Sequence, residues 1–117
     1  MSSYNPKVVT AFFAEHGIPA PWFEHKFHHT RKWRFDIAWL EAGGKPYVAI
    51  EVQGGIWGGG RHNRGAAMLK EYEKLNTATS MGWRVLFFTP QQLCTKETAD
   101  IIKKSLNIPT SWVILRE

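Results

Sequence analysis

The chain has 117 residues, of which 15 are basic and 10 acidic, giving a formal net charge of +5. This length suits one domain spanning residues 1–117, and no stretch reaches the roughly 18 apolar residues that a membrane span requires. A single cysteine, Cys94, excludes both a disulfide framework and a cysteine-based zinc site, which fits a cytoplasmic protein, while the basic balance favours a polyanionic partner such as nucleic acid.

The first half of the chain predicts a helix followed by three strands. Residues 6–16 suit a helix because Pro6 is favourable in a first turn and an apolar stripe follows it. Strands are predicted over residues 22–28, 33–39 and 47–53, and the last two alternate cleanly between apolar and polar side chains. A turn rich in glycine joins these two strands, so we expect them to pair antiparallel.

The second half predicts a glycine-rich basic loop over residues 54–65, a helix over 65–81, a strand over 83–88 and a helix over 95–106. The first of these helices carries residues at helical spacing, namely Met68, Tyr72, Leu75 and Thr79. A strand, a helix and another strand imply a parallel crossover. The expected fold class is therefore α/β, a mixed sheet flanked by helices in the order α-β-β-β-α-β-α.

The register of the two alternating strands brings two carboxylates together. A turn centred between Gly43 and Gly44 pairs Asp36 with Glu51, and opposed residues point to the same face with Cβ atoms about 4.5–5.5 Å apart. The same register gives the other face an apolar set: Phe35, Ile37, Trp39, Val48, Ile50 and Val52. Because the two carboxylates repel each other, we expect either a divalent cation or the nearby Arg34 to offset their charge.

The stretches WRFDIAW (33–39) and YVAIEVQGG (47–55), flanked by helices, resemble the PD-(D/E)XK nuclease superfamily, in particular small phage and bacterial endonucleases of the Holliday-junction-resolvase or very-short-patch-repair kind. The resemblance covers roughly residues 8–90 and implies a restriction-endonuclease-like core. Asp36 matches the motif aspartate, and Glu51-Val52-Gln53 matches the Glu-x-Lys half. The sequence departs from the motif at Phe35, which replaces the proline, and at Gln53, which replaces the lysine.

The resemblance implies a metal-dependent hydrolysis at these residues. Asp36, Glu51 and the Val52 carbonyl would hold Mg²⁺, which Mn²⁺ can replace, and Gln53 would position a water. The missing cation would come from Lys74 on the crossover helix, with the alternatives Lys70, Arg61 and Arg64.

A third acidic residue is expected beside this pair. If residues 22–28 and 33–39 pair around residue 30, Glu24 lies beside Asp36 on the same face, and Glu24 is preferred for this reason. Glu15, on the first helix, is the competing choice, since the resemblance implies that a helical acid can fill this place.

DNA is the expected partner. The glycines of the loop would let its backbone approach a phosphate, Arg61, His62 and Arg64 would supply positive charge, and Trp57 would stack on a base or sugar. Arg31 and Arg34 extend the basic strip on the other side. We therefore predict a Mg²⁺-dependent DNA endonuclease of recombination, repair or phage DNA processing, with branched DNA as the favoured substrate. By analogy with junction resolvases a homodimer is also open, with Trp57 or Trp112 at its interface. The alternatives are a catalytically silent DNA-binding module and a sequence-specific restriction-type nuclease.

Overall fold

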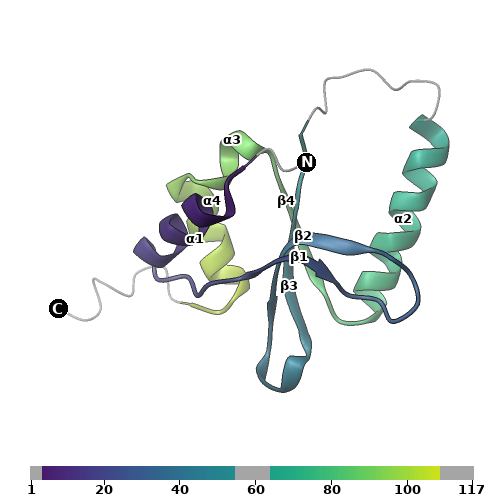
Figure 1. Ribbon diagram of the computed structural model, residues 1–117, viewed down its shortest axis with the longest axis horizontal. Coiled ribbons are helices and arrows are strands. Elements are labelled where there is room, and N and C mark those ends of the chain that lie inside the picture. Colours follow the sequence, from purple (N-terminus) through teal and green to yellow (C-terminus); the bar gives the residue numbers. More distant parts are fainter. Residues whose placement is uncertain (1–3, 55–63, 109–117) are drawn as a thin grey trace.

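The computed structural model describes residues 4–54 and 64–108 (Figure 1). Its elements, in chain order, are α1 (Pro6–Glu15), β1 (Trp22–Lys26), β2 (Arg34–Leu40), the short 3₁₀ turn η1 (Ala42–Gly44), β3 (Pro46–Val52), α2 (Arg64–Ser80), β4 (Arg84–Phe88), α3 (Pro90–Leu93) and α4 (Lys96–Ser105). The predicted order is confirmed, with one further short helix, α3, that the sequence analysis did not anticipate. In the described part of the chain, no helix is both long and apolar enough to cross a membrane.

The four strands form one mixed sheet in the order β1-β2-β3-β4, so the protein is of the α/β class. β1 and β3 both run antiparallel to β2, and β4 runs parallel to β3, as the crossover predicts. Ile37 pairs with Ile50 and Trp39 with Val48, which confirms the predicted register of β2 and β3. Gly43 and Gly44 have φ values of +83° and +80°, a conformation that glycine adopts without strain, so the paired glycines allow the tight turn.

Local side-chain contacts set where the helices begin. The Asn5 carboxamide accepts hydrogen bonds from the backbone N–H groups of Lys7 and Val8, and Thr95 accepts one from Thr98. α3, which the sequence analysis missed, begins at a capping box in which Thr89 and Gln92 satisfy each other's backbone N–H groups. At four residues, α3 is too short to show helical periodicity in the sequence.

Helices cover both faces of the sheet, whereas the sequence predicted one apolar and one polar face. Figure 1 shows α1, α3 and α4 on one side of the sheet and α2 on the other. The side of α1, α3 and α4 holds the larger core, which includes Val9, Phe13, Ile18, Ile37, Trp39, Val48, Ile50, Leu93 and Ile102. The α2 side holds a second cluster, made of Phe27, Phe35, Ala38, Ala49, Ala78 and Trp83.

Phe35 belongs to this second cluster and does not share a face with Ile37 and Trp39, so its predicted placement was wrong. Its ring stacks on Phe27 at a centroid distance of 4.1 Å and lies 5.2 Å from Trp83. Strict alternation fails between Ile37 and Phe35, where the pairing of β1 with β2 is also interrupted. Phe23 pairs with Ile37 and His25 with Phe35, but Glu24 between them has a φ of +51° and is not paired with Asp36.

The face of α2 that packs on the sheet is not the predicted stripe that contains Met68 and Tyr72. Met68 and Tyr72 are 43% and 50% exposed, while Ala78 is fully buried and Lys74 is largely covered. Small residues, Ala38 and Ala49, lie beneath the helix on the sheet. The helix therefore turns a partly charged face inward, so charged side chains are buried between α2 and β3.

Candidate functional site

Asp36 lies where β2 and β3 part. The last paired residues are Ile37 and Ile50, so Asp36 and Glu51 are the next two positions across the gap. Asp36 Oδ2 accepts a hydrogen bond of 2.7 Å from the Val52 N–H, a donor that would otherwise have no partner across the ladder. The carboxylate is thus held at the point of divergence, close enough to Glu51 for the two charges to repel.

Glu51 forms an ion pair with Lys74 across the interface of β3 and α2. Lys74 Nζ lies 2.8 Å from Glu51 Oε2, and the side chains of Lys74 and Glu51 are only 13% and 11% exposed. The ammonium group also lies 5.5 Å from the centre of the Phe35 ring. An ion pair removed from water to this extent must be held by good geometry, since its desolvation opposes its attraction. The structure therefore brings together Asp36, Glu51 and the lysine that the sequence analysis preferred.

Glu71 is a fourth member that the sequence analysis missed. It precedes Lys74 by three residues, so both side chains project from the same face of α2. Its charge disfavours ionisation of Glu51, and its Oε2 atom is buried without a hydrogen-bond partner among the described residues. Its position one helical turn before Lys74 was the available signal.

These four side chains carry more negative than positive charge. Asp36, Glu51 and Glu71 each bring a carboxylate, and Lys74 brings the ammonium group. Arg34, which could have supplied a second cation, instead lies 3.8 Å from Glu24. A buried carboxylate oxygen without a partner costs free energy that a cation or a proton would recover.

This donor set fits a hard divalent cation. Mg²⁺ favours one or two carboxylates together with water and phosphate oxygens, which matches Asp36 and Glu51. Over residues 4–54 and 64–108, no three His, Cys, Asp or Glu side chains are grouped closely enough to hold a metal by themselves. The two carboxylates would therefore share such an ion with water or with an anionic ligand.

Burial raises the pKa of Glu51 from its ordinary value of 4.5 to about 7. The hydrogen bond and the charge of Lys74 oppose this rise, and the charges of Asp36 and Glu71 add to it. Since the folded pKa lies above the unfolded one, the associated stabilisation is complete below pH 4.5 and is lost as the pH rises through about 7.

We therefore expect the free energy of unfolding to fall between pH 4.5 and pH 7 through this one group, by up to about 3 kcal/mol. Urea unfolding in EDTA at several pH values, for the wild type and for Glu51→Gln, measures the effect. The carboxamide of the variant does not titrate, so the difference between the two proteins should change with pH across that window. A difference that stays constant from pH 4.5 to pH 8 would contradict the shifted pKa.

The other two acidic candidates lie apart from this group. Glu24 is 50% exposed in its side chain and is ion-paired with Arg34, and its φ of +51° interrupts the pairing of β1 with β2. The residues around it keep the predicted register, as Phe23 pairs with Ile37 and His25 with Phe35. Glu15 is exposed at the end of α1. No hydrogen bond or ion pair within the described ranges joins either residue to the carboxylates, and the role of Glu24 stays a prediction.

The basic residues predicted to contact DNA are only partly described. Arg31 is ion-paired with Glu73 of α2 at 2.7 Å and lies 3.9 Å from the centre of the Trp33 ring, so the loop between β1 and β2 is tied to α2. Arg64 begins α2, but its side chain is outside the described residues, as are Trp57, Arg61 and His62. Trp112, named for a dimer interface, also lies outside them.

Gln53 follows β3 directly, at the same end of the sheet as Glu51. Its backbone N–H donates to the Phe88 carbonyl at 2.8 Å, which continues the pairing of β3 with β4. Gln53 also borders a small hollow of about 230 Å³ that is lined by Phe87, Phe88, Thr89 and Gln92 as well. This end of parallel strands is where open α/β sheets commonly bind ligands.

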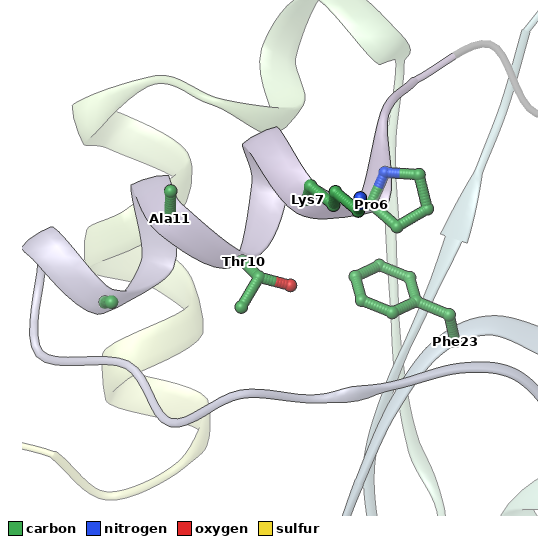
Figure 2. A pocket seen from close by; sticks show the side chains of 6 residues that line it. Pro6, Lys7, Thr10, Ala11 and Phe23 are labelled. Carbon is green, nitrogen blue, oxygen red and sulfur yellow. The ribbon is translucent and has the colours of Figure 1, made fainter.

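A second hollow, of about 480 Å³, lies between α1 and β1 and has no acidic lining. Its helix side is lined by Pro6, Lys7, Thr10, Ala11 and Ala14, and Figure 2 shows the Phe23 ring beside them. Phe23 packs against the core on the α1 side of the sheet, away from α2. The hollow is therefore separate from the carboxylates.

The described site thus consists of Asp36, Glu51, Glu71 and Lys74 between β2, β3 and α2, with Gln53 at the adjoining strand end. Comparisons of the chain with protein families, with curated proteins and with solved structures give no match.

Proposed function

We propose that this protein is a Mg²⁺-dependent DNA endonuclease that hydrolyses phosphodiester bonds, with the fold of the PD-(D/E)XK superfamily. The observation that carries the proposal is the meeting of two strand carboxylates, Asp36 and Glu51, with Lys74 from the crossover helix in a largely buried setting. The net charge of +5 supports a polyanionic substrate. The order of α1, the antiparallel strands β1 to β3, α2 and the parallel strand β4 matches the core that the resemblance implies.

Each residue of the site has a part in this proposal. Asp36 and Glu51 would hold the cation, which when bound polarises the scissile phosphate and lowers the pKa of a water. Lys74 supplies the positive charge that Gln53 cannot, and its contact with Glu51 keeps it in place. Gln53 can orient a water through its amide, as both a donor and an acceptor. Glu71 adds negative charge that strengthens the attraction of the site for a cation.

A catalytically silent DNA-binding module is the second candidate, and one observation favours it. Lys74 already neutralises Glu51 at 2.8 Å, so the ion pair could be purely structural. Such a module would bind DNA through its basic surface without cleaving it.

Incubation with labelled four-way junction, flap, nicked and linear DNA, in Mg²⁺, Mn²⁺ or EDTA, separates the two candidates. The nuclease predicts cleavage of at least one substrate in Mg²⁺ or Mn²⁺ and none in EDTA. Binding without cleavage in every metal condition would overturn the nuclease and support the silent module. Cleavage that persists in EDTA would show that no divalent cation is needed.

A further inference from the structure

Phe87 is a large apolar side chain that remains 46% exposed near the end of β4. It is the parallel-strand partner of Glu51, while its neighbour Phe88 is the partner of Val52. Val52 and Phe88 both pack against the core on the α1 side. Because successive strand residues point to opposite faces, Phe87 and Glu51 share the other face, where Lys74 lies.

The hollow beside Phe87 is bordered by aromatic and carboxamide residues. Gln53 and Gln92 line it together with Phe87. Gln92 is held in place because its Oε1 atom accepts the Thr89 N–H at 2.9 Å. The Gln53 amide makes no side-chain hydrogen bond to the described residues, so it can serve a ligand. The ring thus lies on the strand position directly across from Glu51, and the Gln53 amide lies two residues beyond Glu51 along the chain.

A nucleobase has the chemistry that this hollow would recognise. A base offers a flat face for stacking on an aromatic ring and an edge for hydrogen bonds with amides. The volume of about 230 Å³ lies below the ~300–1,000 Å³ of sites that bury drug-sized ligands, so it suits one base. A base inside a duplex keeps both faces stacked on its neighbours, and only an unpaired or extruded base can enter such a site.

We propose that Phe87, Gln53 and Gln92 form a subsite for one unpaired nucleobase next to the bond that is cut. This inference rests on the proposed nuclease function and narrows its substrate to DNA that carries an unpaired nucleotide at the cleavage position, as in a flap, a junction arm or a frayed end. Stacking does not depend on the identity of the base, so little sequence preference is expected.

Oligonucleotides with 2-aminopurine as the unpaired base test the subsite by binding, in EDTA so that no cleavage occurs. The wild type and Phe87→Tyr should quench its fluorescence, whereas Phe87→Ala and Phe87→Leu should bind roughly 5- to 150-fold more weakly, the loss that stacking of about 1–3 kcal/mol predicts. Trp22→Ala is the matched control, because Trp22 is 63% exposed on β1 at the opposite edge of the sheet. Its binding and quenching should equal those of the wild type.

The subsite would be overturned if Phe87→Leu bound the oligonucleotide as tightly as the wild type does. It would also be overturned if substitution of Phe87 weakened the binding of fully paired DNA by the same factor. A loss of dimers in Phe87→Ala by sedimentation would overturn it too, because Phe87 would then be an interface residue. Cleavage assays keep the two proposals apart. If the wild type quenches 2-aminopurine fluorescence through Phe87 but cuts no DNA, the result supports the subsite and contradicts the nuclease. Cleavage of flap and duplex in the same ratio by the wild type and Phe87→Ala contradicts the subsite and supports the nuclease.

Discussion

Replacing Asp36 with Asn or Glu51 with Gln is expected to lower the rate of DNA cleavage at least about 100-fold. Each change removes one of the two carboxylates that would bind the cation, and the loss of a charge that stabilises the transition state typically costs that much or more. Asp36→Asn keeps an oxygen that can accept the Val52 N–H, so the strand ends should stay in place. Single-turnover cleavage of the best substrate, at saturating Mg²⁺ and then at saturating Mn²⁺, measures the loss.

A control that removes one carboxylate elsewhere shows whether the loss of cleavage rate is specific to Asp36 and Glu51. Asp100→Asn removes one carboxylate from α4, where Asp100 is ion-paired with Lys96, far along the chain from β2 and β3. Its cleavage rate should stay within about twofold of the wild type, as expected for a surface pair. Cleavage that survives both Asp36→Asn and Glu51→Gln would mean that these residues are not the catalytic carboxylates.

The same assay decides which acid assists the pair. Glu24→Gln breaks an exposed ion pair with Arg34, whereas Glu71→Gln removes a charge that acts on Glu51. From the geometry, Glu71→Gln should raise the Mg²⁺ concentration needed for half-maximal cleavage more than Glu24→Gln does. The reverse order would favour the acid that strand register alone selected.

The strand register could be predicted from the sequence because it depends on local rules. Alternation with a period of two and a glycine turn fix which residues oppose each other, and the pairing of Ile37 with Ile50 follows from them. The position of Lys74 could be anticipated only because a crossover helix must pack on the sheet beside β3. Its contact with Glu51 depends on the rotation of that helix.

The rest could not be read from the sequence because tertiary packing overrides local pattern. Phe35 leaves the expected face beside the unpaired Glu24 of β1. Its ring packs with Phe27, in the β1–β2 connection, and with Trp83, just before β4, which no local rule brings together. Helix α2 packs a partly charged face on small residues of the sheet, so the apolar residues at helical spacing, such as Met68 and Tyr72, lie on its exposed face. Glu71 was missed for the same reason.

Replacing Lys74 with Met is expected to destabilise the protein by about 3 kcal/mol at pH 8, because the Glu51 carboxylate would stay buried without its partner. The loss should be smaller at pH 5. There Glu51 takes up a proton, since its pKa is already raised to about 7 and the missing ammonium group would raise it further. Urea unfolding in EDTA at both pH values measures the difference, and Lys74→Arg, which keeps the charge, is the control.

The double variant Glu51→Gln, Lys74→Met separates a structural lysine from one that acts on the substrate. Both charges of the ion pair are absent, so most of the stability should return, because replacing a buried pair by neutral groups is often nearly neutral. Cleavage should not return. For Lys74→Met alone, at a temperature where it is folded, a lowered cleavage rate with unchanged DNA affinity would place the ammonium group at the transition state. Full cleavage by a folded Lys74→Met would instead limit Lys74 to holding Glu51, and the missing motif cation would have to come from another basic residue.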